Sequence, residues 1–342
     1  MQTKLYCGID LHSSNCYLGI IDQTGQRVFH RRVKNDLELI LKYLAPFREE
    51  MESMTVESTY NWYWLVDGLI DSGYSVKLAN PGAIQQYSGL KHGDDKTDSF
   101  WLAELLRLDI LPTGYIYPRA ERSLRDMLRR RSRFVQQRTA HILSIKSAMS
   151  RHLGKTQSTS SLLMLDSEAL EELFGSGTDD LQMTIGLSMS TVRFMSEKIK
   201  QLERYAEKKI HLRDDYKKLL NSPGIGKILG LTIMLEIGDI SRFEKVGNFT
   251  SYCRCANASR FSNGKKKGNN NSKNGNKYLS WALVEAAHHA VRHYPAIQKF
   301  YQRKLAKKNH ILAIKATAAK LSKALYFMLT NDEEFNMKRA FC

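Results

Sequence analysis

The order of short apolar runs in the first third of the chain limits the possible folds more than any other feature. Three runs typical of β-strands follow one another closely, at residues 5–11, 15–22 and 27–33. Helical patterns then alternate with further strands: helix 35–47, strand 53–58, helix 61–73 and strand 74–80. This order predicts a mixed α/β sheet whose last strands are connected through helices.

Three strands followed by helix, strand, helix, strand and helix is the order of a ribonuclease-H-like (RuvC-like) domain. We predict such a catalytic domain over residues 1–118. A basic helix and a coiled-coil region are expected over 119–220, because residues 183–220 have the repeating apolar positions and mixed charges of one long helix. We predict a third, helical domain over 221–342, so the expected fold class is α/β followed by all-α.

Four acids stand where predicted strands end or a predicted helix begins. Asp10 ends the first strand, and Glu57 ends the fourth. Asp95 and Asp98 are three residues apart at the start of the next helix, so they share one helical face. The first and fourth strands are neighbours in such a sheet, so the four carboxylates are expected to converge. Acids at a helix start can also serve only as caps, and that alternative is open.

Converging carboxylates need a compensating cation, because several like charges at close range cannot all stay ionised. Hard oxygen ligands suit Mg²⁺ or Mn²⁺. Such ions can activate an attacking oxygen and stabilise a leaving oxygen on phosphorus. The acids therefore indicate a metal-dependent protein that acts on phosphodiesters.

The formal net charge of +17 is concentrated in two stretches. Residues 119–155 contain eleven lysines or arginines and two acids, and residues 254–277 contain seven and no acid. Each phosphate that a cation neutralises releases condensed counterions, so clusters of this kind predict a nucleic-acid partner.

Two patterns in the helical part of the chain indicate phosphate contacts. Five arginines recur at helical spacing and are expected to form a phosphate track: Arg119, Arg122, Arg125, Arg129 and Arg133. The segment SPGIG at 222–226 has the pattern of a helix–hairpin–helix turn, in which backbone N–H groups near Gly224, Gly226 and Lys227 can face a phosphate. The alternatives are a solvated helix whose arginine stems cover the core, and an ordinary turn.

Composition excludes several other classes of protein. A hydrophobic content of 42% is that of a folded chain, and no apolar run approaches the roughly 20 residues of a membrane span. The first ten residues lack the apolar region of a signal peptide. The five cysteines include no C-x-x-C pair, which argues against a zinc site or a disulfide framework. We therefore expect a cytoplasmic protein without a membrane partner.

Several motifs together resemble the DEDD transposases of insertion sequences, a family that includes Piv-type DNA invertases and recombinases guided by a bridge RNA. The N-terminal motifs are GIDLH at 8–12, VEST at 56–59, NPG at 80–82 and DKTDSFWLAELL at 95–106. Residues 219–243 and 261–283 are similar to the family's C-terminal signature. The resemblance covers nearly the whole chain.

This resemblance implies a transposase or site-specific recombinase that cuts and rejoins DNA. It implies that Asp10, Glu57, Asp95 and Asp98 are the four catalytic acids. The partners it implies are donor and target DNA, a structured guide RNA and further copies of the chain in a dimer or tetramer. A nucleoid-associated location in a bacterium or archaeon follows from the same resemblance.

The resemblance also implies a catalytic serine that becomes transiently linked to DNA. The best match is Ser262 in the loop FSNGKKKG at 261–268, and Ser259 and Ser272 are alternatives. Nearby lysines are expected to hold phosphates: Lys265, Lys266, Lys267 and Lys273.

Two other functions fit the same residues. One is a metal-dependent nuclease of the junction-resolvase type, which hydrolyses DNA with water and forms no covalent link. The other is a non-catalytic nucleic-acid-binding protein whose acids only cap helices.

Overall fold

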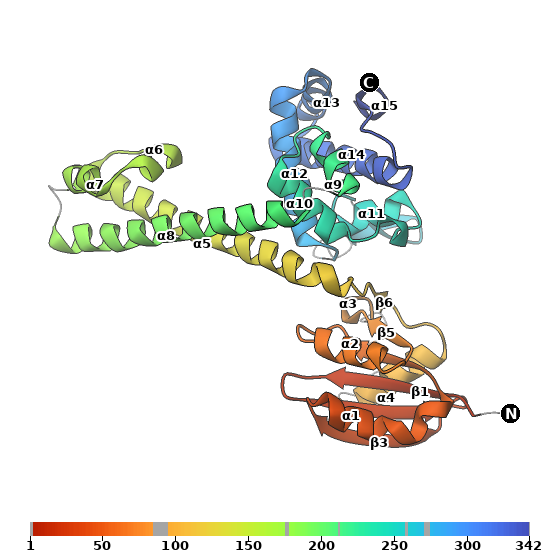
Figure 1. The fold of residues 1–342 in the computed structure, drawn as a ribbon. Helices are drawn as coiled ribbons and strands as arrows, with labels where there is room; N and C mark the ends of the chain where they lie inside the picture. The colour runs from red at the N-terminus through yellow and green to blue at the C-terminus, as the bar shows by residue number, and fades with distance from the viewer. Residues whose placement is uncertain are drawn as a thin grey trace. The chain divides into compact units, whose positions relative to one another are not determined.

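The computed structural model describes residues 3–84, 95–174, 178–210, 213–256, 259–269 and 274–341. The chain divides into two compact units, Met1–Arg119 and Ala120–Cys342 (Figure 1). The first is a mixed α/β sheet domain and the second is mostly helical, which confirms the predicted fold class at this level. Within the described residues, no helix has both the length and the apolar character of a membrane span.

The first unit is built on a sheet with the strand order β3-β2-β1-β4-β5-β6. Its strands are β1 (Leu5–Leu11), β2 (Asn15–Asp22), β3 (Arg27–Lys34), β4 (Met51–Glu57), β5 (Val76–Ala79) and β6 (Thr113–Gly114). β1 is antiparallel to β2 and parallel to β4, with Ile9 opposite Val56. The carboxyl ends of β1 and β4 therefore meet at one edge of the sheet, as the order of elements predicts.

Helices cover both faces of this sheet. On one face, α1 (Leu37–Leu44) and α2 (Tyr63–Asp71) pack against the side chains of β1 that include Cys7 and Ile9. On the other face, Phe100 and Ala103 of α4 (Asp95–Arg107) pack against Ile21. Two short helical segments, η1 (Ala45–Glu50) and α3 (Pro81–Ile84), complete the described part of this unit.

Helix α4 lies directly on the sheet because the strand residues beneath it are glycines. A Cβ at Gly8 would lie 2.0 Å from the carbonyl oxygen of Ser99, and a Cβ at Gly19 would lie 2.6 Å from Ser99 Oγ. No side chain could be added at either position without moving the helix. This close packing holds the first turn of α4, which carries Asp95 and Asp98, near the end of β1.

The described part of the second unit contains two long helices, a group of shorter helices and one β-hairpin. Its elements are α5 (Arg119–Leu153, whose first residue belongs to the first unit), α6 (Thr159–Met164), α7 (Ser167–Phe174), α8 (Asp179–Ile210), α9 (Asp214–Leu220), α10 (Lys227–Ile237), η3 (Ile240–Arg242), α11 (Val246–Tyr252), β7 (Ser259–Ser262), β8 (Lys265–Asn269), α12 (Lys277–His293), α13 (Pro295–Leu305), α14 (His310–Thr330) and α15 (Met337–Phe341).

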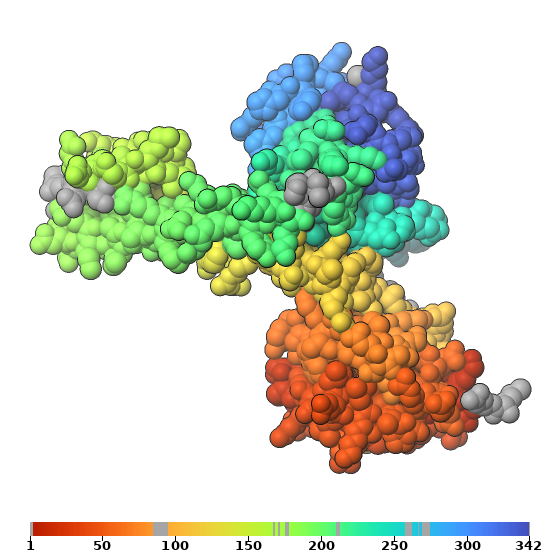
Figure 2. All heavy atoms as spheres, in the orientation of Figure 1, coloured from red at the N-terminus to blue at the C-terminus, as the bar shows by residue number. Residues whose placement is uncertain are grey.

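The long helices α5 and α8 pack side by side in opposite directions. Ile145 and Met149 near the end of α5 meet Ile185 and Met189 near the start of α8. Figures 1 and 2 show this helical arm extending from the group α9–α15, with α6 and α7 at its far end. The partner of the predicted coiled-coil helix is therefore a helix of the same chain.

The prediction of one continuous helix over 183–220 is wrong. Helix α8 ends at Ile210, and α9 begins after Arg213, whose backbone is extended with φ −73° and ψ 133°. The Arg213 side chain binds Asp215 at 2.7 Å and Glu121 at 2.5 Å. These ion pairs stabilise the extended, non-helical backbone at Arg213, which the apolar repeat alone does not reveal.

The core of the second unit forms around α10, α12 and α14. Helix α10 is buried from Leu229 to Ile237, so its nearly uniform apolar sequence needs no polar face. One acid, Glu236, is buried in this helix with only 2% of its surface exposed. A buried carboxylate needs cations or hydrogen-bond donors around it, and α5 and the start of α12 supply them.

Candidate functional site

The structure brings two of the four predicted acids together with a histidine. The Nε2 atom of His12 lies 3.4 Å from Asp10 Oδ2 and 3.4 Å from Asp95 Oδ2. One potential ligand atom from each of these residues lies within 4.8 Å of the others. Asp10 is only 4% exposed, whereas Asp95 is at the surface. The cluster therefore joins the end of β1 to the first turn of α4.

Glu57 and Asp98 lie close enough to perturb the same carboxyl group. Burial raises the pKa of Asp10 to about 7, against the opposite effect of the neighbouring His12 ring. A hydrogen bond with Glu57 and the negative charges of Glu57 and Asp98 add to the increase. An acid with a raised pKa beside other acids is a site that lacks positive charge, which a divalent cation would supply.

His12 is a functional candidate that our sequence reasoning missed. Its carbonyl oxygen accepts hydrogen bonds from the side-chain amides of Asn35 and Asn61, each at 3.0 Å, which fixes the chain just beyond β1. The available signal was its spacing: residues two apart along an extended chain point to the same face. His12 stands two residues after Asp10, so it was placed to share that site.

The predicted arginine track is corrected by the structure. Arg122 and Arg125 are buried, Arg129 is mostly buried, and Arg133 is exposed. Arg119 binds Asp67 and Asp71 at 3.0 and 2.8 Å. The helical spacing does align these arginines, but the middle of the row faces the protein core. It cannot form one continuous exposed surface for phosphates.

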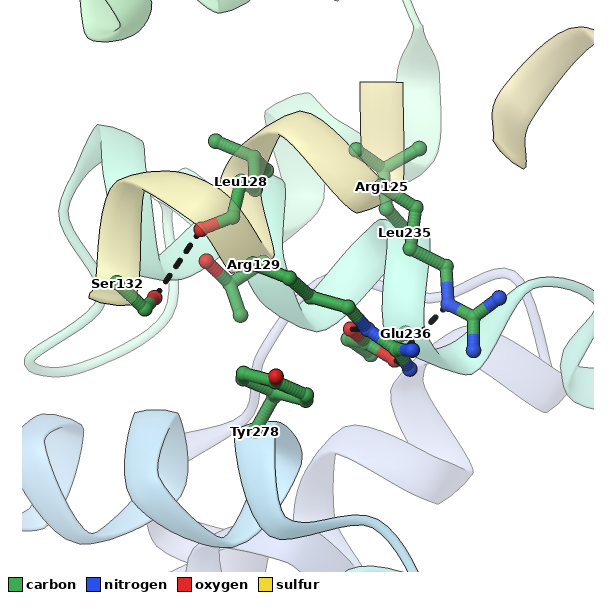
Figure 3. A pocket seen from close by; sticks show the side chains of 8 residues that line it. Arg125, Leu128, Arg129, Ser132, Leu235, Glu236 and Tyr278 are labelled. Carbon is green, nitrogen blue, oxygen red and sulfur yellow. Dashed lines mark hydrogen bonds and ion pairs between the residues drawn. The ribbon is translucent and has the colours of Figure 1, made fainter. Parts of the chain in front are cut away.

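Arg125 and Arg129 face inward because both pair with the buried carboxylate of Glu236. Arg129 donates to both of its carboxylate oxygens, from Nε at 2.6 Å and Nη2 at 2.7 Å, and Arg125 Nε donates at 3.0 Å (Figure 3). Burial alone would raise the pKa of Glu236, but the hydrogen bonds and charges of the two arginines outweigh it and lower that pKa. The pair Arg129–Glu236 thus has the bidentate geometry of a strong ion pair.

One glycine of the predicted helix–hairpin–helix turn lies against a neighbouring helix. Gly224 has a φ of 75° and packs against α12, where a Cβ would lie 2.1 Å from the carbonyl oxygen of Ala286. Close packing therefore requires a glycine here, and the predicted phosphate contact of the backbone N–H groups stays a prediction. Gly226 is exposed at the start of α10, and Lys227 is exposed and lies 3.0 Å from Glu207.

The predicted serine loop is a β-hairpin in the structure. Strands β7 and β8 pair with Ser262 opposite Lys265, and Asn263 and Gly264 form the two-residue turn with φ of 49° and 69°. Asn-Gly between two short strands is a strong local signal for such a hairpin, so the expectation of a loop is wrong here. Ser262, Lys265 and Lys267 are exposed.

The other residues of this prediction are less fully described. Ser259 and Lys266 are in the hairpin strands, and only their backbone positions are described. Ser272 and Lys273 lie outside the described residues.

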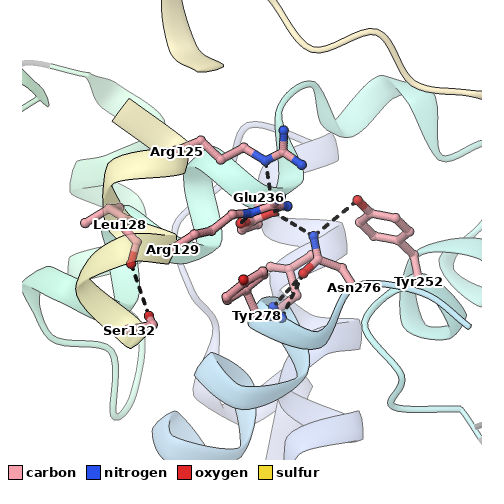
Figure 4. A network of polar contacts seen from close by, with 9 residues as sticks. Arg125, Leu128, Arg129, Ser132, Glu236, Tyr252, Asn276 and Tyr278 are labelled. Carbon is pink, nitrogen blue, oxygen red and sulfur yellow. Dashed lines mark hydrogen bonds and ion pairs between the residues drawn. The ribbon is translucent and has the colours of Figure 1, made fainter. Parts of the chain in front are cut away.

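Hydrogen bonds fasten the two ends of the segment that carries the hairpin. The backbone N–H of Asn276 donates to the carbonyl oxygen of Tyr252 at 2.6 Å, and Arg254 donates twice to the carbonyl oxygen of Gly275. The Asn276 amide donates to Glu236 at 2.7 Å and to the Tyr252 hydroxyl at 3.2 Å (Figure 4). The base of this segment is thereby joined to the buried Glu236.

Glu236→Gln is expected to destabilise the second unit strongly. The amide can still accept a hydrogen bond, but the change removes the negative charge that pairs with two largely buried guanidinium groups. Removing one partner of a buried ion pair costs about 3–5 kcal/mol. Denaturant unfolding measures the loss. Glu207→Gln, which removes the partner of exposed Lys227, should cost about 1 kcal/mol or less; similar small losses for both variants would contradict a structural role for Glu236.

Two family models match the chain. A model of DEDD type for IS110 elements, described as "Transposase", matches residues 7–153. A model described as "Transposase IS116/IS110/IS902 family" matches residues 216–302. No curated protein matches the chain. The first matched segment contains the acidic cluster, and the second contains Glu236 and the serine hairpin.

Proposed function

We propose that this chain, which belongs to the IS110 family of DEDD transposases, cuts and rejoins DNA strands. It is an enzyme that acts on DNA. In the proposed mechanism it uses metal-binding carboxylates and a covalent serine–DNA link. The observation that carries the proposal is the cluster of Asp10, His12 and Asp95, with the raised pKa of Asp10. Such a cluster is suited to a cation and a phosphodiester rather than to an uncharged substrate.

The donor set fits a divalent metal. Asp10, Glu57, Asp95 and Asp98 would hold Mg²⁺ or Mn²⁺, because carboxylate oxygens are the ligands that both ions prefer. When bound, the ion would supply positive charge at the scissile phosphate and polarise its oxygens. His12 bridges Asp10 and Asp95 and would keep these two carboxylates oriented toward each other.

Asp10→Asn tests the metal site without requiring catalysis. In the fold the pKa of Asp10 rises from 3.8 to about 7. Between these pH values the unfolded chain releases this proton while the folded chain keeps it, so the free energy of unfolding falls as pH rises. In a chelator near pH 8, Asp10→Asn should therefore melt at a higher temperature than the unchanged protein, and the difference should vanish near pH 4.

Metal addition completes this test. Mn²⁺ or Mg²⁺ at about pH 8 should raise the melting temperature of the unchanged protein and have little effect on Asp10→Asn. An equal response of the two proteins to the metal would show that Asp10 is not a ligand.

We propose that Ser262 is the nucleophile. Its Oγ would form a bond to a DNA phosphorus while the bond from that phosphorus to a sugar oxygen breaks, with the serine proton passing to the departing oxygen through solvent. Attack by a second sugar oxygen reverses the exchange and frees the serine. The phosphodiester energy is conserved, which agrees with the absence of a GxxxxGK[ST] nucleotide-binding motif from the sequence. The exposed Lys265 and Lys267 would hold the scissile phosphate.

The network around Glu236 would act as a positioning device for this serine. It fastens Tyr252 and Asn276, which stand on either side of the hairpin segment. A nucleophile must be held close to its productive position, and hydrogen bonds that join Tyr252 and Arg254 to Gly275 and Asn276 serve that need by fixing the two ends of the segment.

The wider arrangement we propose follows the family. The strand order supports a ribonuclease-H-like catalytic domain over 1–118, followed by a basic coiled-coil region (119–220) and a transposase domain (221–342) with a helix–hairpin–helix-like turn. The protein would act as a dimer or tetramer on donor and target DNA, in the nucleoid-associated cytoplasm of a bacterium or archaeon.

We further propose a structured bridge RNA as guide, for which the net charge of +17 gives support. Sequencing the nucleic acid that co-purifies with the protein tests this partner. A discrete RNA transcribed from beside the encoding gene is the expected result, and random fragments alone would contradict it.

A further inference from the structure

A groove of about 600 Å³ lies in the second unit between α5 and the first turns of α12. The described residues of its lining combine cations with two aromatic rings and one acid. The lining residues used below are Arg129, Arg130, Arg133, Lys277, Tyr278 and Trp281. Among the described residues that line this groove, none belongs to the acidic cluster or to the serine hairpin.

The two aromatic side chains stand three residues apart on α12 and so share one face of that helix. Tyr278 and Trp281 are both half-buried, and Trp281 packs partly against the core. Arg129, which Glu236 holds in place, lies 4.7 Å from the centre of the Tyr278 ring. Lys277 Nζ also lies 5.1 Å from the centre of the Tyr278 ring, so a base that stacks there displaces this exposed side chain toward its own phosphate. Both rings remain partly accessible.

The cationic side chains of the groove differ in burial and in their ion pairs within the protein. Arg129 belongs to the buried network, whereas Arg130, Arg133 and Lys277 are exposed. The acid of the lining, Asp126, is exposed as well. The exposed part of the lining therefore carries a net positive charge beside flat apolar rings.

We propose that this groove binds unpaired nucleotides of a single nucleic-acid strand. Bases stack on Trp281 and Tyr278, and the adjoining phosphates lie against Lys277, Arg130 and Arg133. A basic surface interleaved with aromatic rings is the chemistry that recognises single strands, because every base has a flat face and every nucleotide a charge. A paired helix keeps its bases stacked inside and offers only its phosphates to such a groove.

The proposal rests on the proposed function only in taking nucleic acid as the partner. It requires neither the metal nor a covalent serine link. A binding measurement in EDTA therefore separates its failure from a failure of the catalytic proposal.

The test is fluorescence anisotropy with labelled oligonucleotides: oligo-dT, oligo-U of equal length, and a DNA duplex. Trp281→Leu should weaken binding of a single strand roughly fivefold or more, while duplex binding changes little. Trp281→Phe, which keeps a ring, should bind nearly as the unchanged protein does. The matched control is Phe194→Leu, since Phe194 is an exposed aromatic residue with Lys198 over its ring.

A charge variant keeps the proposal testable if Trp281→Leu folds poorly. Replacing the exposed Arg133 and Lys277 by glutamine should flatten the log–log salt dependence of single-strand binding by roughly 1.4, at about 0.7 per lost contact. A larger effect on oligo-U than on oligo-dT would assign the groove to RNA, and the reverse would assign it to DNA.

Two results would overturn the proposal. One is single-strand binding by folded Trp281→Leu, or by the charge variant, that equals that of the unchanged protein. The other is an equal loss of single-strand and duplex binding in Trp281→Leu.

Discussion

Asp10→Asn is expected to abolish DNA strand cleavage while nucleic-acid binding stays nearly unchanged. Asparagine keeps the shape of the side chain but removes the charge from a position that is only 4% exposed and 3.4 Å from His12. Losing one carboxylate ligand weakens metal binding, whereas the stretches that hold most of the positive charge are in residues 119–155 and 254–277. Asp98→Asn should behave in the same way.

Cleavage of labelled DNA in Mg²⁺ and a parallel binding titration measure the two effects separately. Asp109→Asn is a suitable control, because the Asp109 side chain is 91% exposed and lies 3.3 Å from the Nζ atom of the exposed Lys77. The control should cleave normally. Full cleavage by both Asp10→Asn and Asp98→Asn would rule out the metal site, and joint loss of cleavage and binding would indicate that the acids support the fold.

Ser262→Ala should remove both the covalent DNA adduct and recombination. The side chain is exposed at the end of β7, beside the turn, so its hydroxyl supports no core and folding should be unaffected. Metal and RNA binding should persist as well. Adduct formation can be measured by denaturing electrophoresis of the protein with labelled DNA.

Ser259→Ala and Ser272→Ala are the matched controls for this variant. If one of them loses the adduct while Ser262→Ala forms it normally, the nucleophile is a neighbouring serine and the mechanism stands. Normal recombination by all three variants would refute a serine mechanism, and hydrolysis by a metal-dependent nuclease would replace it.

The sheet was predictable because its signals are local. The first two predicted strands, 5–11 and 15–22, have the bounds of β1 and β2, and the third differs from β3 by one residue. Short apolar runs separated by turn residues leave few alternatives to a strand. The meeting of the ends of β1 and β4 then follows from topology, which is why Asp10 and Glu57 could be expected near each other.

The buried network was not predictable in the same way. Helical spacing placed Arg125 and Arg129 on one face, but spacing does not reveal whether a face meets solvent or a buried carboxylate. Their partner Glu236 stands more than a hundred residues later in the sequence. The one local clue was an acid inside an otherwise apolar helix, which requires a buried cation somewhere in the fold.

Unlike the buried network, the hairpin had a local sequence signal. The composition around Ser262 favoured a loop instead. Glycine, asparagine and lysine around Ser262 suggested a loop, yet Asn263 and Gly264 alone favour a tight two-residue turn between paired strands. His12 also had a local signal, its spacing of two residues from Asp10, but carboxylates alone define the acidic pattern of the sequence.

The most direct test of the account is to locate the covalent link by mass spectrometry of the trapped and digested adduct. Trypsin separates the three candidate serines, since Ser259, Ser262 and Ser272 fall in peptides 255–260, 261–265 and 268–273. The account predicts a nucleotide remnant on the peptide 261–265, which contains no other serine. Cleaved DNA with free ends and no modified peptide would contradict it.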